Sequence, residues 1–88
     1  MLKISDAGAS DIDVTLGLDG EVTGPWVDVL RSSCDVALGR GARLTLDLSH
    51  VSFADAGGIA LLRSLTDRQV RLVNASPFLA ELMRRARP

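Results

Sequence analysis

The sequence predicts an α/β fold in one domain that spans residues 1–88, with a mixed four-stranded sheet and helices mainly on one face. Some segments alternate apolar and polar residues as strands do, and others repeat apolar residues at helical spacing. The two kinds of segment follow one another in the order β-β-α-β-α-β-α. Strands separated by helices require parallel crossovers, whereas the first two strands can pair antiparallel. Because strands covered on both faces would be continuously apolar, we expect an open face opposite the helices.

The amino-acid composition argues against a membrane-spanning protein, a nucleic-acid-binding protein and a disulfide-bonded one. Hydrophobic residues make up 47% of the 88 residues, which is enough for a core, and no apolar run is long enough to span a membrane. The net charge of −1, with one Trp, two Phe and no Tyr, argues against nucleic acid as a partner. Cys34 is the only cysteine, which excludes an intramolecular disulfide and fits a reducing compartment. We therefore expect a cytoplasmic protein without direct membrane insertion.

Two strands are expected before the first helix. Leu2 and Ile4 indicate a short strand that ends near residues 6–8. The apolar positions of the second strand are Ile12, Val14, Leu16 and Leu18. We expect Gly20 to end this strand.

The first helix is expected to begin at residues 23–25, because a proline such as Pro25 is tolerated in a first helical turn. The residues that recur at helical spacing, and should form the buried stripe of this helix, are Trp26, Leu30, Ser33, Cys34, Ala37 and Leu38. Since Cys34 lies in this stripe, we expect it to pack in the core rather than to react. Gly39 and Gly41 should end the helix, one of them in the left-handed conformation.

The most informative segment runs from residue 44 to residue 62. Alternating apolar positions predict a strand at Leu44, Leu46 and Leu48. After a short connection, Asp55 is expected to cap a helix, because an aspartate at this position accepts hydrogen bonds from the first free amides. Gly57 and Gly58 would let a neighbouring surface approach the backbone closely. We expect the function to reside at this junction of strand and helix.

A short strand and a third helix are expected at the C-terminal end. Val70 and Leu72 alternate with Arg71 and Val73, as in a short strand. Ser76 and Pro77 have the residue types of an N-cap and a first helical position. The apolar stripe of this helix comprises Phe78, Leu79, Leu82, Met83 and Ala86. Its last turn contains Arg84, Arg85 and Arg87, whose positive charge offsets the helix dipole.

The candidate chemical groups favour structural roles. Ser49 and His50 are neighbours in a strand or turn, so their side chains should point apart and not form a nucleophile–base pair. Asp47 and Asp55 alone offer too few oxygen ligands for a metal. The glycine pair lacks the Gly-Lys-Ser/Thr element of a phosphate loop. We therefore expect no enzymatic activity, no cofactor and no metal.

The segment at residues 46–59 resembles the signature of STAS domains, the family of the sporulation anti-anti-sigma factors. That signature is an apolar strand, Asp-Leu-Ser, a turn with Val, and Asp-Ser-Ser-Gly or Asp-Ser-Thr-Gly at the start of an apolar helix. Here it reads Asp47-Leu48-Ser49, Val51 and Asp55-Ala56-Gly57-Gly58. The resemblance extends weakly to residues 17–22 and 70–74. At position 56, where regulated members carry the phosphorylated Ser, this chain has Ala56.

The resemblance implies a bacterial, non-catalytic module that binds a protein partner and regulates transcription. The implied partner is an anti-sigma factor of the serine-kinase type, whose phosphorylation of the Ser breaks the complex. Because Ala56 has no hydroxyl, the protein either binds constitutively or is regulated elsewhere. Alternatively, residues 58–62 resemble a Gly-Leu-Ala-Leu-Leu run of STAS subunits that bind the ATPase of bacterial lipid-transport ABC complexes. Those subunits need no phosphoserine.

We expect the partner-binding surface to comprise a turn at residues 52–56 and the outward side of the following helix. Helical spacing should direct Ile59, Leu62, Leu65 and Thr66 towards the sheet. The candidate partner-binding residues are Ser52, Asp55, Ala56, Gly57, Gly58, Ala60, Arg63, Ser64 and Asp67.

Overall fold

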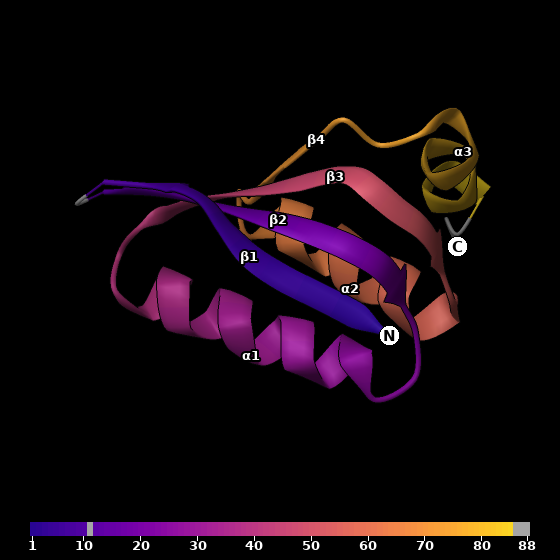
Figure 1. The fold of residues 1–88 in the computed structure, drawn as a ribbon, viewed down its shortest axis with the longest axis horizontal. Helices are drawn as coiled ribbons and strands as arrows, with labels where there is room; N and C mark the ends of the chain where they lie inside the picture. Colours follow the sequence, from indigo (N-terminus) through magenta and orange to yellow (C-terminus); the bar gives the residue numbers. More distant parts are fainter. Residues whose placement is uncertain (11, 86–88) are drawn as a thin grey trace.

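The computed structural model describes residues 1–10 and 12–85, and in them the element order is the predicted one (Figure 1). The strands and helices are β1 (Leu2–Ala9), β2 (Asp13–Val22), α1 (Trp26–Gly39), β3 (Arg43–Ala54), α2 (Ala56–Asp67), β4 (Arg71–Val73) and α3 (Pro77–Arg85). None of the helices in these residues is long and apolar enough to cross a membrane. Ala86 and Arg87, which were expected in the third helix, lie outside the described residues.

The sheet is mixed, as the sequence predicts. Its strands lie in the order β1-β2-β3-β4; β1 pairs antiparallel with β2, and the other two pairs are parallel. Figure 1 shows α1 and α2 side by side against one face of the sheet, and α3 beside the end of β3. The opposite face is largely open, so the expectation of helices mainly on one face is confirmed.

Side chains in β2 and β3 point alternately to the covered face and to the open face of the sheet. Leucines at positions 16, 18, 44, 46 and 48 are buried against the helices. Thr15 and Thr45, which point the other way, are only partly buried. Full burial of a leucine side chain stabilises a fold by about 1.5–3 kcal/mol, so this one face supplies much of the stability.

β2 is longer than predicted, because Gly20 does not end it. Gly20 has a φ of +118°, a conformation that glycine tolerates and other residues rarely adopt. A Cβ at this position would lie 2.2 Å from the carbonyl oxygen of Met1. Gly20 therefore allows the start of β1 to lie close to β2, and β2 continues to Val22.

β3 is also longer than predicted, and the expected connection after Leu48 is wrong. The pairing of β2 with β3 shifts twice, between Gly17–Asp47 and Asp19–His50 and again between Gly20–Val51 and Glu21–Phe53. Each shift is a β-bulge, in which two residues of β3 oppose one position of β2. The buried positions therefore change from every second residue to every third, at Leu48, Val51 and Ala54. Ser49–His50 and Ser52–Phe53 are left exposed as pairs of neighbours.

α1 buries half of the predicted stripe. Leu30, Cys34 and Ala37 are buried, Trp26, Ser33 and Leu38 are partly buried, and Val27 is buried although the pattern did not include it. Burial raises the pKa of the Cys34 thiol to about 11, so Cys34 is a core residue, as predicted. After the helix, Gly41 has the expected left-handed conformation, with a φ of +79°.

Candidate functional site

Asp55 joins the start of α2 to the loop between β2 and α1. Its Oδ1 accepts a hydrogen bond from the amide of Gly58 at 2.8 Å, which confirms the predicted N-cap. Its Oδ2 accepts a second bond, at 2.9 Å, from the amide of Gly24, which is distant in the sequence. The amide of Asp55 itself donates to the carbonyl oxygen of Val22 at 3.2 Å. One residue therefore fixes the ends of β2 and β3 and the beginnings of both helices.

These hydrogen bonds favour the charged form of Asp55. The amide of Gly24, followed by that of Gly58, lowers the pKa of the carboxyl below its ordinary value of 3.8. A carboxyl whose pKa is lower in the folded state adds stability above its unfolded-state pKa. That contribution is lost as the pH falls through the folded-state pKa.

We expect Asp55→Ala to lower the midpoint of thermal unfolding at pH 7 by about 4–8 °C, the effect of losing one cap in a domain of this size. The difference from wild type should shrink as the pH falls below the ordinary carboxyl pKa of 3.8, because the carboxyl is then protonated first in the unfolded chain and, at still lower pH, in the folded protein. Asp55→Asn is the matched control, since it keeps one acceptor but cannot titrate. Melting curves between pH 2.5 and pH 7, followed by circular dichroism, measure this. A difference that stays constant with pH would contradict the assigned role.

The two glycines at the start of α2 have different environments. Gly57 is exposed, and a Cβ there would lie 3.6 Å from Asp55 Oδ1, an ordinary contact. Gly58 is buried, and its Cβ would lie 2.1 Å from the carbonyl oxygen of Val22. The surface that approaches Gly58 closely is therefore the end of β2 in the same chain. Gly58 shapes the junction from inside, whereas Gly57 is accessible.

Most of the other candidate residues are exposed at the end of β3 or along α2. Ser52, Ala56, Ala60, Ser64 and Asp67 are exposed, and Arg63 is partly buried. The Ser52 hydroxyl donates to the carbonyl oxygen of Gly20 at 3.3 Å. Ser52 lies within β3, at its second bulge, so the expected turn at residues 52–56 is instead the end of a strand followed by the cap.

A groove of about 470 Å³ separates the outer part of α2 from α3. It is lined by Arg63, Thr66, Asp67, Met83 and Arg84. The expectation that Thr66 faces the sheet is wrong: Thr66 is exposed and its hydroxyl donates to the carbonyl oxygen of Arg63 at 2.6 Å. Leu61 is buried instead, so the buried face of α2 is wider on the side of Leu61 than predicted.

Two exposed aromatic residues, one near the end of β3 and one in α3, contact each other, which the sequence did not predict. Phe53 and Phe78 stack with ring centroids 6.3 Å apart and planes inclined by 27°. Their exposed fractions are 39% and 55%, so the prediction that Phe78 belongs to the buried stripe of α3 is wrong. The second bulge exposes Phe53, and α3 places Phe78 against it. The α3 helix is capped as predicted, because the Ser76 hydroxyl accepts a hydrogen bond from the amide of Leu79. The loss of alternation after Leu48 is the one signal in the sequence that points to this exposure.

Ser49 and His50 form a contact that the sequence argues against. The first bulge leaves both side chains exposed, and Ser49 Oγ lies 3.2 Å from His50 Nδ1. Asp47 does not complete a triad, because its Oδ1 accepts from the Ser49 amide at 3.0 Å and from Asn74 Nδ2 at 3.2 Å. These bonds, chiefly the one from the Ser49 amide, lower the pKa of the Asp47 carboxyl. Asp47 thus holds the first bulge and the end of β4 together.

Titratable side chains in residues 1–10 and 12–85 do not gather into a metal site. No group of three or more His, Cys, Asp or Glu residues in this part of the chain could hold an ion. The candidate site combines the polar cap at Asp55, the exposed aromatic pair and the groove between α2 and α3. Such a surface suits contact with another macromolecule, because aromatic side chains are enriched where proteins bind one another.

Comparison with known proteins identifies the family. A family model described as "Mlab, STAS domain" matches residues 5–87. No curated protein matches the sequence. Among solved structures, the anti-sigma factor antagonist SpoIIAA in its unphosphorylated form has the same fold, with a TM-score of 0.73 and 19% sequence identity over 93% of this chain and 82% of that chain. The element order, the mixed sheet and the match over nearly the whole length lead to one conclusion: this chain belongs to the STAS domain family.

Proposed function

We propose that this protein is a non-catalytic regulatory module that binds another protein through the start and the outer side of α2. The observation that supports this most is the exposed Phe53–Phe78 pair beside the rigid junction at Asp55. Exposed aromatic residues next to a fixed backbone can anchor a partner without a large loss of conformational entropy. The proposed binding residues are the exposed pair Phe53 and Phe78 together with Ser52, Asp55, Ala56, Gly57, Ala60, Arg63, Ser64 and Asp67, with Gly58 shaping the surface from below.

The first proposed partner is an anti-sigma factor of the serine-kinase type, which would make the protein a cytoplasmic regulator of transcription. The support is the STAS family and the fold shared with the anti-sigma factor antagonist SpoIIAA. Ala56 is exposed at the first position of α2 and has no hydroxyl to phosphorylate. We therefore propose that the protein binds this partner without a phosphorylation cycle at position 56.

The second proposed partner is the ATPase subunit of a bacterial lipid-transport ABC complex. The sequence of residues 58–62 resembles that of STAS subunits that bind such ATPases, and a subunit of this kind needs no phosphoserine. The family model that matches the chain takes its description from Mlab rather than from an anti-sigma factor antagonist. Both proposals use the same surface and differ in the partner.

Affinity capture with matched charge reversals tests the proposal. Immobilised wild-type protein, Arg63→Glu and Arg31→Glu are each exposed to a lysate of the source bacterium, and the bound proteins are identified by mass spectrometry. Arg63 lines the groove beside α2, whereas Arg31 lies on α1. We expect the wild type and Arg31→Glu to retain a kinase-like protein or a transport ATPase, and Arg63→Glu to bind it about 10-fold to 100-fold more weakly.

Circular dichroism must show that both variants remain folded. The proposal would be contradicted if Arg63→Glu still bound the partner while substitution of Arg84 and Arg85 abolished binding. That result would place the binding site on the end of α3. Genes that encode an anti-sigma factor beside this one would favour the first partner, and permease and ATPase genes would favour the second.

A further inference from the structure

A basic cavity lies at the end of the sheet farthest from Asp55, where β3 and β4 begin. Its volume is about 410 Å³. Three arginines from separate segments line it: Arg43 at the start of β3, Arg68 after α2, and Arg71 at the start of β4. Leu38 and Ala42 add apolar surface. Arginine at such a density, next to apolar side chains, is a typical environment for an organic anion.

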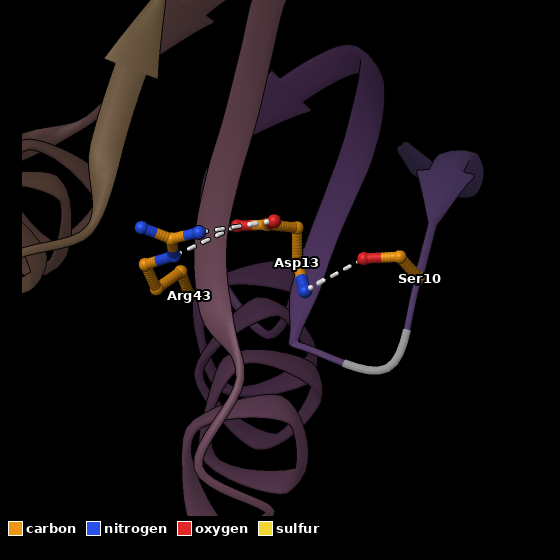
Figure 2. Close-up of polar contacts among 3 residues, drawn as sticks. All are labelled: Ser10, Asp13 and Arg43. Atoms are coloured by element: carbon orange, nitrogen blue, oxygen red, sulfur yellow. Dashed lines mark hydrogen bonds and ion pairs between the residues drawn. The ribbon is translucent and has the colours of Figure 1, made fainter.

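Among residues 1–10 and 12–85, the carboxylates paired with the arginines of this cavity are fewer than the arginines themselves. Asp13 is the acidic residue in the cavity wall, and it accepts two hydrogen bonds from Arg43, at 3.0 and 3.3 Å (Figure 2). The amide of Asp13 donates to the hydroxyl of Ser10, which holds Asp13 in place (Figure 2). Arg68 donates to Asp35 of α1 at 2.8 Å and also offsets the negative end of the α2 dipole. Arg71 forms no ion pair within the described part of the chain.

Gln69 provides a second and independent indication. It lines the same cavity and has a φ of +66°, the left-handed conformation in which glycine is usual after a helix. Its amide donates to Thr66 and the amide of Val70 donates to Leu65, both at 3.0 Å, so the chain closes α2 as it would around a glycine. A glutamine in this conformation costs stability, and such strain is found at functional sites more often than elsewhere. A ligand contact by its side-chain amide would account for its presence.

We propose that this cavity binds a small phosphate monoester with a short apolar body. Arg71 and the free N–H groups of Arg43 and Arg68 hold the phosphate, and the Gln69 amide donates a further hydrogen bond. Guanidinium groups that approach from three segments suit a tetrahedral dianion better than a planar carboxylate. The apolar body lies against Leu38 and Ala42. The residues that line this cavity are not among the proposed protein-binding residues, and the proposal does not depend on the function proposed above.

Nuclear magnetic resonance titration of the ¹⁵N-labelled protein tests the site. The probes are hexyl phosphate, inorganic phosphate and hexanol. Hexyl phosphate should shift the amide signals of residues 42–45 and 68–71 and bind more tightly than inorganic phosphate, whereas hexanol should cause no shift there. Arg71→Gln should weaken binding of hexyl phosphate about 10-fold, the effect of losing one charged hydrogen bond. Arg31→Gln on α1, which does not line the cavity, should bind as the wild type does.

Gln69→Gly separates a ligand contact from a structural role. Glycine relieves the left-handed strain, so this variant should melt at a higher temperature than the wild type. It should nevertheless bind hexyl phosphate about 3-fold to 10-fold more weakly, because one neutral hydrogen bond is lost. Unchanged affinity in both Gln69→Gly and Arg71→Gln would overturn the site. Equal binding of hexyl phosphate and inorganic phosphate would overturn the apolar part of the proposal.

Discussion

Gly58→Ala is expected to destabilise the protein by about 3 kcal/mol or more, because the new methyl group would overlap backbone that cannot move. A Cβ at this position lies 2.1 Å from the carbonyl oxygen of Val22 and 3.2 Å from the Cβ of Ala54. The same oxygen accepts a hydrogen bond from the amide of Asp55, and both Val22 and Ala54 are buried. Relief of the overlap would require α2 to move away from the sheet. Urea and thermal unfolding of the purified variant measure the loss.

Gly57→Ala is the matched control, one residue earlier in the same helical turn. Its Cβ would meet no atom closer than 3.6 Å, so the substitution should gain the ordinary advantage of alanine over glycine in a helix, about 0.5–1 kcal/mol. The two variants therefore have effects of opposite sign. If Gly58→Ala proved as stable as Gly57→Ala, the close packing of α2 on the end of β2 would be disproved.

The parts of the fold that could be predicted are those specified by local patterns. The alternation at Leu44, Leu46 and Leu48 sets the buried face of β3, and it depends on side chains that are neighbours along the strand. The N-cap of Asp55 is local too, since its acceptor reaches an amide three residues later. Order, topology and the covered face follow from such signals because a strand–helix–strand unit has few ways to pack.

The parts that could not be predicted depend on contacts between distant residues. A β-bulge is a property of two paired strands, so the second half of β3 resembled a connection when read alone. Exposure of Phe53 and its stacking on Phe78 follow from that bulge and from the position of α3. The bond from the Gly24 amide to Asp55 likewise joins segments that are adjacent only in the folded chain. Local patterns therefore indicated the cap at Asp55 but not the aromatic pair of Phe53 and Phe78.

Ala56→Glu is expected to weaken binding of the protein partner about 100-fold, provided that the start of α2 is the interface. Ala56 is exposed at the first position of the helix, two residues after the end of β3 and close in sequence to Phe53. In the complex a glutamate here would lose its water shell against the partner, at a cost of about 3 kcal/mol. In the free protein the same charge is favourable, because it lies at the positive end of the α2 dipole. The affinity should fall while the melting temperature stays equal or rises slightly.

Ala56→Ser completes the comparison, because it adds a hydroxyl without a charge. Serine is well tolerated in a first helical turn, so this variant should fold and bind as the wild type does. Affinities of the three proteins for the captured partner, measured by calorimetry beside melting curves of each, separate an effect on binding from an effect on folding. Equal affinity of the wild type and Ala56→Glu would remove the start of α2 from the interface. A loss confined to Ala56→Glu would instead show that a neutral residue at position 56 keeps the protein competent to bind, which is the role proposed for the missing hydroxyl.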